Sequence, residues 1–137
     1  MTAITHRHRG ATHTDAHLLR FALRADATLC AGLGLFVAMA ADPLARLSGL
    51  TATADWIAGA ALVAYGALLY SAARLADLRR VGGAVFAGNV SFTVATAVVL
   101  VAGWLPLTGF GEAATAAFTA ITVIFAWLQY LGVRRLA

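Results

Sequence analysis

The stretch that decides the fold is VGGAVFAGNVSFTVATAVVLVAGW, Val81 to Trp104, which contains no charged residue. An α-helix rises about 1.5 Å per residue, so about 20 apolar residues cross a hydrocarbon core of ~30 Å. This segment is long enough and apolar enough to do so. We therefore expect it to be a transmembrane helix.

Three further apolar segments lie around it, at about residues 18–41, 56–73 and 113–133. The sequence therefore predicts an all-α fold, a transmembrane antiparallel four-helix bundle occupying residues 18–137. The uncharged part of the first segment, Ala27–Ala41, is too short to cross by itself. Arg24 and Asp26 are therefore expected to lie within the membrane boundary or to reach toward it.

The composition of the 137-residue chain agrees with a membrane location. Apolar residues make up 61% of the chain and charged residues 12%, whereas soluble domains are about 45–50% apolar and about 25% charged. The mean hydropathy is +0.83. These values argue against a water-soluble enzyme, a disordered chain and a nucleic-acid-binding module. The single cysteine, Cys30, excludes an internal disulfide and a cysteine-based zinc site.

Residues that cap or break helices separate the four segments. Asp42 and Pro43 predict the start of a short interfacial helix that Gly49 ends. Gly82-Gly83 is expected to form a tight cytoplasmic turn, and Glu112 to lie in the first turn of the last helix. The other expected caps and breaks are Thr51, Thr53, Asp55, Pro106, Gly109 and Gly111.

The arginines set the expected orientation, because the chain has no lysine. All of them except Arg46 precede or begin the first span, separate the second from the third, or follow the fourth. The positive-inside rule then places both termini in the cytoplasm. The pI of about 10.2 follows from this asymmetry and needs no nucleic-acid partner. The arginines expected to attract anionic lipid headgroups are Arg20, Arg79, Arg80, Arg134 and Arg135.

Residues 1–17 are polar and are expected to form a flexible cytoplasmic tail. All four histidines of the chain lie there: His6, His8, His13 and His17. Their spacing suits only loose metal binding, so we predict no metal site, and the spans offer no histidine pair for a haem. We predict no cofactor. An alternative interpretation, a signal peptide cleaved near Ala38-Met39-Ala40, is disfavoured by Asp26.

Small and polar residues recur at helical spacing in every span, and such faces pack helices together in lipid. They are Gly34 and Ala38; Asp55, Gly59 and Gly66; Asn89, Thr93 and Thr96; and Thr115, Thr119, Thr122, Ala126 and Gln129. Ordinary helix packing is sufficient to explain these stripes, because threonine hydroxyls can bond to their own helix backbone.

Six polar side chains are expected at a similar depth when the helical rise is counted from the cytoplasmic boundary. They are Arg24, Asp26, Tyr70, Arg74, Asn89 and Gln129. A carboxylate at that depth is costly unless it is paired or hydrated. We therefore expect Asp26 to pair with Arg74, or less easily with Arg24, and to hydrogen-bond Asn89. The cluster is then either a clamp that fixes helix register or a pocket for a headgroup or small solute.

Three short motifs carry a resemblance to known membrane proteins: LRFALRADA (Leu19–Ala27), AGN (Ala87–Asn89) and LQY (Leu128–Tyr130). With them, nearly the whole span region resembles small four-span integral membrane proteins of high-GC Gram-positive (actinobacterial) type, and its plan is similar to that of DoxX-like proteins. The resemblance implies a four-helix architecture and an inner-membrane location, and no assigned activity. Small multidrug transporters have the same size, but their signature glutamate is replaced here by Asp26, displaced toward the cytoplasm.

The sequence contains no Ser-His-Asp set, no metal-ligand cluster in the spans and no phosphate-binding loop, so we expect a non-enzymatic protein. The leading hypothesis is an accessory or structural subunit that forms a homo-oligomer or joins a larger membrane complex. The alternative is a small-solute transporter or a lipid- or quinone-binding protein that uses Asp26 and Asn89. A third is an oxidoreductase subunit whose partner carries the cofactor.

Overall fold

The computed structural model describes the backbone of residues 3–136 and the side chains of residues 16–136. The regular secondary structure of this part is entirely helical: α1 (Ala3–Met39), α2 (Ala41–Ser48), α3 (Ala52–Ala72), α4 (Leu78–Ala102) and α5 (Gly109–Arg135). Residues Ala16–Met39 of α1 and the whole of α3, α4 and α5 are each long and apolar enough to cross a membrane. The described residues thus confirm the predicted all-α fold and the prediction of four helices long and apolar enough to span a membrane.

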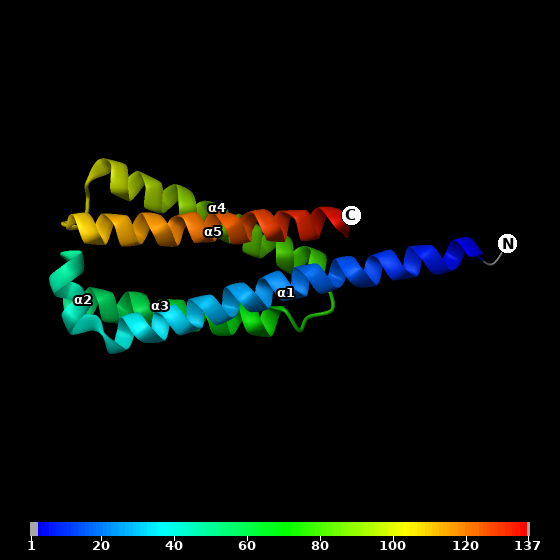
Figure 1. Ribbon diagram of the computed structural model, residues 1–137, viewed down its shortest axis with the longest axis horizontal. Helices are drawn as coiled ribbons and strands as arrows, with labels where there is room; N and C mark the ends of the chain where they lie inside the picture. The colour runs from blue at the N-terminus through cyan, green and yellow to red at the C-terminus, as the bar shows by residue number, and fades with distance from the viewer. Residues whose placement is uncertain (1–2, 137) are drawn as a thin grey trace.

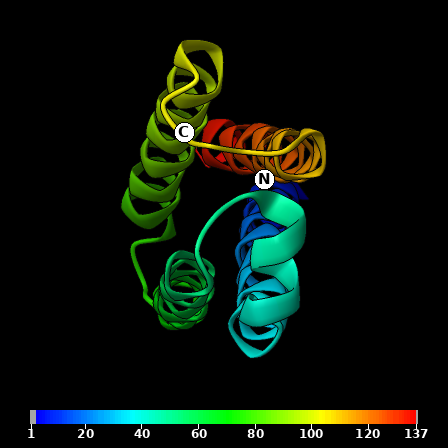
Figure 2. The same ribbon diagram turned by 90° about the vertical axis from the view of Figure 1, so that its left-hand side faces the viewer.

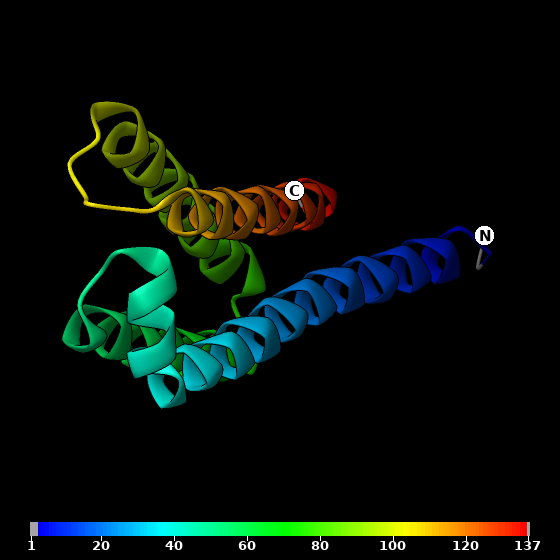
Figure 3. The ribbon, with the colours of Figure 1, turned by 60° about the vertical axis from the view of Figure 1, so that its left-hand side comes forward.

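The long helices associate as two pairs (Figure 1). α1 packs along α3, α4 packs against α5, and α1 also contacts α5. Figure 2, which looks along the molecule, shows α3 and α4 as neighbours, yet their direct contact is marginal. In Figure 3, α4 and α5 diverge toward the end of the molecule at which α2 lies. The helices are therefore held together less tightly at the α2 end than at the other.

Glycines bring α1 and α3 into backbone contact. A Cβ atom at Gly34 would lie 2.5 Å from the carbonyl oxygen of Gly59, and one at Gly59 would lie 2.5 Å from the backbone nitrogen of Ala38. Farther along, a Cβ atom at Gly66 would lie 2.7 Å from the carbonyl oxygen of Ala27. Such close approach is how helices gain packing energy in lipid. The small-residue faces of the first two spans are thus used within the chain itself.

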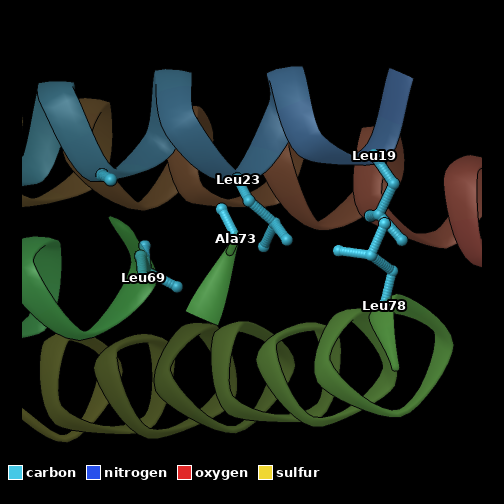
Figure 4. Close-up of a cluster of buried hydrophobic side chains, with 6 residues drawn as sticks. Leu19, Leu23, Leu69, Ala73 and Leu78 are labelled. Carbon is cyan, nitrogen blue, oxygen red and sulfur yellow. The ribbon is translucent and has the colours of Figure 1, made fainter. Parts of the chain in front are cut away.

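The main apolar core lies where α1 passes the connection between α3 and α4 (Figure 4). Leu19 and Leu23 of α1 pack against Leu69 of α3, against Ala73 at the C-terminal end of α3, and against Leu78 of α4. Each of these side chains is at most 6% exposed. This core joins α1, α3 and α4 around the connection between α3 and α4.

The structure corrects the predicted turn at Gly82-Gly83, because both glycines lie inside α4. The helix begins instead after Asp77, whose carboxylate accepts a hydrogen bond from the backbone N–H of Arg80. Gly82 serves packing: a Cβ atom there would lie 2.9 Å from a methyl carbon of Leu19. Gly82 therefore allows close packing of α4 against Leu19 and does not form a turn.

The short helix predicted between the first two spans is α2. Ala40 is its N-cap, so Asp42, predicted for that role, falls in the first turn. Gly49 ends α2 in the left-handed conformation with φ of 85°, as predicted. The predicted cap at Thr51 is also confirmed, because its hydroxyl accepts a hydrogen bond from the N–H of Ala54.

The last three spanning helices begin earlier than residues 56, 81 and 113, where the sequence placed them. α5 starts at Gly109 after the N-cap Thr108, and Glu112 lies in its first turn as predicted. Gly111 is buried where the first turn of α5 meets the carbonyl of Ser48, at the end of α2. Polar capping residues, rather than the first apolar residue, therefore set these helix starts.

The α1 backbone is helical from Ala3, whereas residues 1–17 were predicted as a separate tail. Extending an existing helix adds one hydrogen bond per residue and needs no new nucleus, which favours continuation past the apolar segment. His17 is exposed. The predictions about His6, His8 and His13 concern side chains outside the described residues. The flexibility of the tail stays a prediction.

Candidate functional site

A buried polar network joins three helices near the middle of the molecule. Asp26 on α1 is 4% exposed, Asn89 on α4 is 4% exposed, and Gln129 on α5 is completely buried. The amide nitrogen of Asn89 donates to Oδ2 of Asp26 at 3.3 Å and to Oε1 of Gln129 at 3.0 Å. The amide nitrogen of Gln129 donates to the same Oδ2 at 2.8 Å. Three of the six predicted site residues are thus in direct contact.

Two residues that the sequence analysis left out complete this network. Sγ of Cys30 lies 3.4 Å from Oδ1 of Asp26 and donates to it one helical turn further along α1. The hydroxyl of Tyr65 on α3 donates to Oδ1 of Asn89 at 2.9 Å and so links the two helices that otherwise scarcely touch. The four-residue spacing from Asp26 identifies Cys30 as a neighbour on the same helix face. No comparable local signal identifies Tyr65.

The other predicted site residues do not join the network, which corrects the expected ion pair of Asp26. Arg24, Tyr70 and Arg74 are all exposed, and the Arg74 guanidinium carbon lies 4.8 Å from the centroid of the Tyr70 ring. The salt bridge found among the side chains of residues 16–136 joins Arg80 and Asp77 at the surface, with Nε of Arg80 3.5 Å from Oδ2 of Asp77. Arg74 lies beyond the end of α3, where its charge can remain in a polar environment rather than be buried beside Asp26.

A cavity of about 460 Å³ lies next to the network, between all four long helices. It is lined by Asp26, Cys30, Ala58, Ala61, Leu62, Tyr65, Gly88, Asn89, Phe92, Phe118 and Thr122. From the network, the cavity extends toward α2, because its lining residues on α3 and α5 lie closer to α2 than the network does. This is also the direction in which α4 and α5 diverge (Figure 3). The cavity is therefore mainly apolar, with its polar groups gathered at one end.

The geometry of the cavity suits an amphipathic guest. Apolar and aromatic side chains surround most of its length, and the carboxylate, amide and phenol groups converge at one end. Few polar groups in an otherwise apolar pocket are the usual arrangement in sites for small organic molecules.

The threonines of α5 do not contribute free hydroxyls to this cavity. Thr115, Thr119 and Thr122 each donate to the carbonyl oxygen four residues earlier in their own helix, at 2.8, 2.8 and 3.0 Å. Thr122 lines the cavity and is 8% exposed. The threonine stripe therefore contributes to packing, as the ordinary interpretation of the sequence predicted.

The arginines predicted to meet lipid headgroups lie toward one end of the molecule, where α4 begins and α5 ends (Figure 1). Arg79, Arg80, Arg134 and Arg135 are exposed, whereas Arg20 is partly buried. The guanidinium carbon of Arg134 lies 5.6 Å from the centroid of the Tyr130 ring. Their interaction with anionic lipid stays a prediction.

Comparisons of the chain with protein-family models, with curated proteins and with solved structures find no match. The resemblance to DoxX-like and actinobacterial four-span proteins therefore stays a prediction.

Proposed function

We propose that this chain is a non-enzymatic multi-pass membrane protein that binds a lipophilic small molecule in the cavity beside Asp26 and Asn89. The observation that carries this proposal is a buried, hydrogen-bonded carboxylate at one end of an otherwise apolar cavity of about 460 Å³. A carboxylate in the interior of a membrane protein is a functional-site hypothesis by default.

The size of the cavity favours a binding pocket over a clamp alone. A clamp needs the hydrogen bonds among Asp26, Asn89 and Gln129, but it needs no open space next to them. The cavity is partly open at its rim, so a lipid chain or a ligand can enter it from the hydrocarbon phase.

The orientation in the membrane is part of the proposal. The four long helices run up and down as an antiparallel bundle in the cell inner membrane, with both termini in the cytoplasm, as the arginine distribution favours. The marginal contact between α3 and α4 supports access to the cavity from the side, between these two helices. Transport remains one use of such a site, and binding is the step that transport would require.

Filling the cavity tests the proposal. Gly88 lines it, and a Cβ atom there would meet no atom within 4 Å, so Gly88→Leu should occupy the cavity without displacing a helix. Gly83→Leu is the matched control, because Gly83 lies on the same helix with equally open surroundings and does not line the cavity. The probe is phenylbutanol, whose uptake is measured by equilibrium dialysis in a neutral detergent.

We expect wild type and Gly83→Leu to bind about one phenylbutanol per chain above the micelle background, and Gly88→Leu to bind much less. Equal uptake by wild type and Gly88→Leu would overturn the proposal, because partition into the micelle would then account for all of the bound probe.

A second candidate is the accessory or structural subunit. The observation in its favour is the exposure of α4, on which Val94, Val98 and Val101 are 58%, 48% and 90% exposed. A partner helix could cover this face as well as lipid can. Crosslinking in membranes followed by native mass spectrometry tests it. A chain that stays single throughout would contradict the accessory role and leave the binding site unaffected.

A further inference from the structure

The network around Asp26 contains no cationic side chain among the residues that the structure describes. Oδ2 accepts from two neutral amides, those of Asn89 and Gln129, and Oδ1 accepts from the thiol of Cys30. Each of these neighbours acts as a donor, which is the pattern that an ionised carboxylate requires. Within the described side chains, the one salt bridge involves Asp77 and not Asp26.

An ionised carboxylate with only neutral neighbours is incompletely compensated. Hydrogen bonds from amides reduce the cost of burying the charge, but a cation reduces it further in a low-dielectric environment. The thiol of Cys30 is a weak donor at 3.4 Å. Oδ1 of Asp26 can therefore still accept a hydrogen bond from a strong donor.

The cavity provides a second, independent feature, an aromatic wall that suits the apolar part of such a ligand. Tyr65, Phe92 and Phe118 line it, and the rings of Phe92 and Phe118 are 5.8 Å apart in an edge-to-face arrangement. These rings can bury the apolar part of a guest while its polar group reaches Asp26.

We propose that the ligand of this site is a lipophilic amine bound in its protonated form. Its ammonium group donates a hydrogen bond to Oδ1 of Asp26, and its hydrocarbon or aromatic part lies among Ala61, Phe92 and Phe118. This inference rests on the proposed function, and it adds the charge of the ligand. A quinone or a neutral lipid has no cation for Asp26 and does not meet this requirement.

The test compares phenylbutylamine with phenylbutanol, which differ only in the terminal ammonium or hydroxyl group. Equilibrium dialysis is done at neutral pH, where the amine is protonated, in a neutral detergent. Gly88→Leu supplies the comparison for each probe, since its leucine would take up part of the cavity. We expect wild type to bind the amine at least about tenfold more tightly than the alcohol, as for one charge-assisted hydrogen bond.

The variant Asp26→Asn keeps the size of the side chain and removes its charge. We expect this variant to bind the amine and the alcohol with about equal affinity, while its affinity for phenylbutanol changes little from wild type. Gly83→Leu should keep the preference of wild type. If Asp26→Asn does not fold, the wild-type ratio of the two affinities still decides the question.

The possible results separate the two proposals. Equal binding of amine and alcohol by wild type, both lost in Gly88→Leu, would overturn the cationic ligand and leave the binding site in place. A preference that persists in Asp26→Asn would also overturn it, because the charge would then act elsewhere. If neither probe binds wild type more than Gly88→Leu, the proposed binding function itself fails.

Discussion

Replacing Gly59 with alanine is expected to destabilise the protein by about 3 kcal/mol, because α1 and α3 are in backbone contact at this residue. The added Cβ atom would lie 2.5 Å from the backbone nitrogen of Ala38 and 2.5 Å from the carbonyl oxygen of Gly34. Neither atom belongs to a flexible side chain that could move aside. The two helices would have to separate, and this would loosen the Gly34 and Gly66 contacts on either side.

The measurement is the free energy of unfolding in mixtures of mild and denaturing detergent. Gly32→Ala is the matched control on α1, because a Cβ atom at Gly32 would meet no atom within 4 Å. It should be neutral or stabilise by up to about 1 kcal/mol, through the better helix propensity of alanine. Equal stabilities of Gly59→Ala and Gly32→Ala would contradict the close packing of α1 on α3.

Replacing Asn89 with leucine is expected to cost about 3 kcal/mol. The leucine is similar in size, but it donates no hydrogen bond to Asp26 or Gln129 and accepts none from Tyr65. The carboxylate of Asp26 would stay buried with one amide donor fewer. A buried charge that has lost a partner is among the most destabilising single changes.

A second substitution should restore much of this loss. In the double variant Asp26→Asn with Asn89→Leu the buried charge is gone, and the amide introduced at position 26 can exchange two hydrogen bonds with Gln129. We expect the double variant to be more stable than Asn89→Leu alone by about 1–2 kcal/mol. If the losses in unfolding free energy of Asp26→Asn and Asn89→Leu simply add in the double variant, Asn89 does not compensate the charge of Asp26.

The sequence predicted the spanning helices well, because apolar length and polar caps are local properties. Val81–Trp104 and Thr51 are examples, and in each the deciding information lies within one segment. Gly82-Gly83 misled the prediction, since a glycine pair can serve a turn or a close contact. The buried contact of Gly82 with Leu19 depends on how α1 and α4 meet, which no single segment specifies.

The site was predicted in part for the same reason. Asp26, Asn89 and Gln129 could be grouped because polar residues at similar depth in apolar helices have few other partners. The pairing of Asp26 with Arg74 was wrong, because Arg74 lies beyond the end of α3, where its charge can remain in a polar environment. Tyr65 and the cavity depend on the marginal contact between α3 and α4, a property of the assembled helices.

The most direct test of the cavity as a binding site uses Cys30, the single cysteine of the chain, which is 4% exposed and lines the cavity. The measured quantity is the rate at which N-ethylmaleimide alkylates Cys30 in lipid vesicles, with and without phenylbutylamine, at about pH 9, where thiols react faster and the amine is still mostly protonated. We predict that the amine slows alkylation severalfold in wild type and in Gly83→Leu, and that Gly88→Leu is slow from the start and insensitive to the amine. An alkylation rate in wild type that saturating amine leaves unchanged would contradict the binding site.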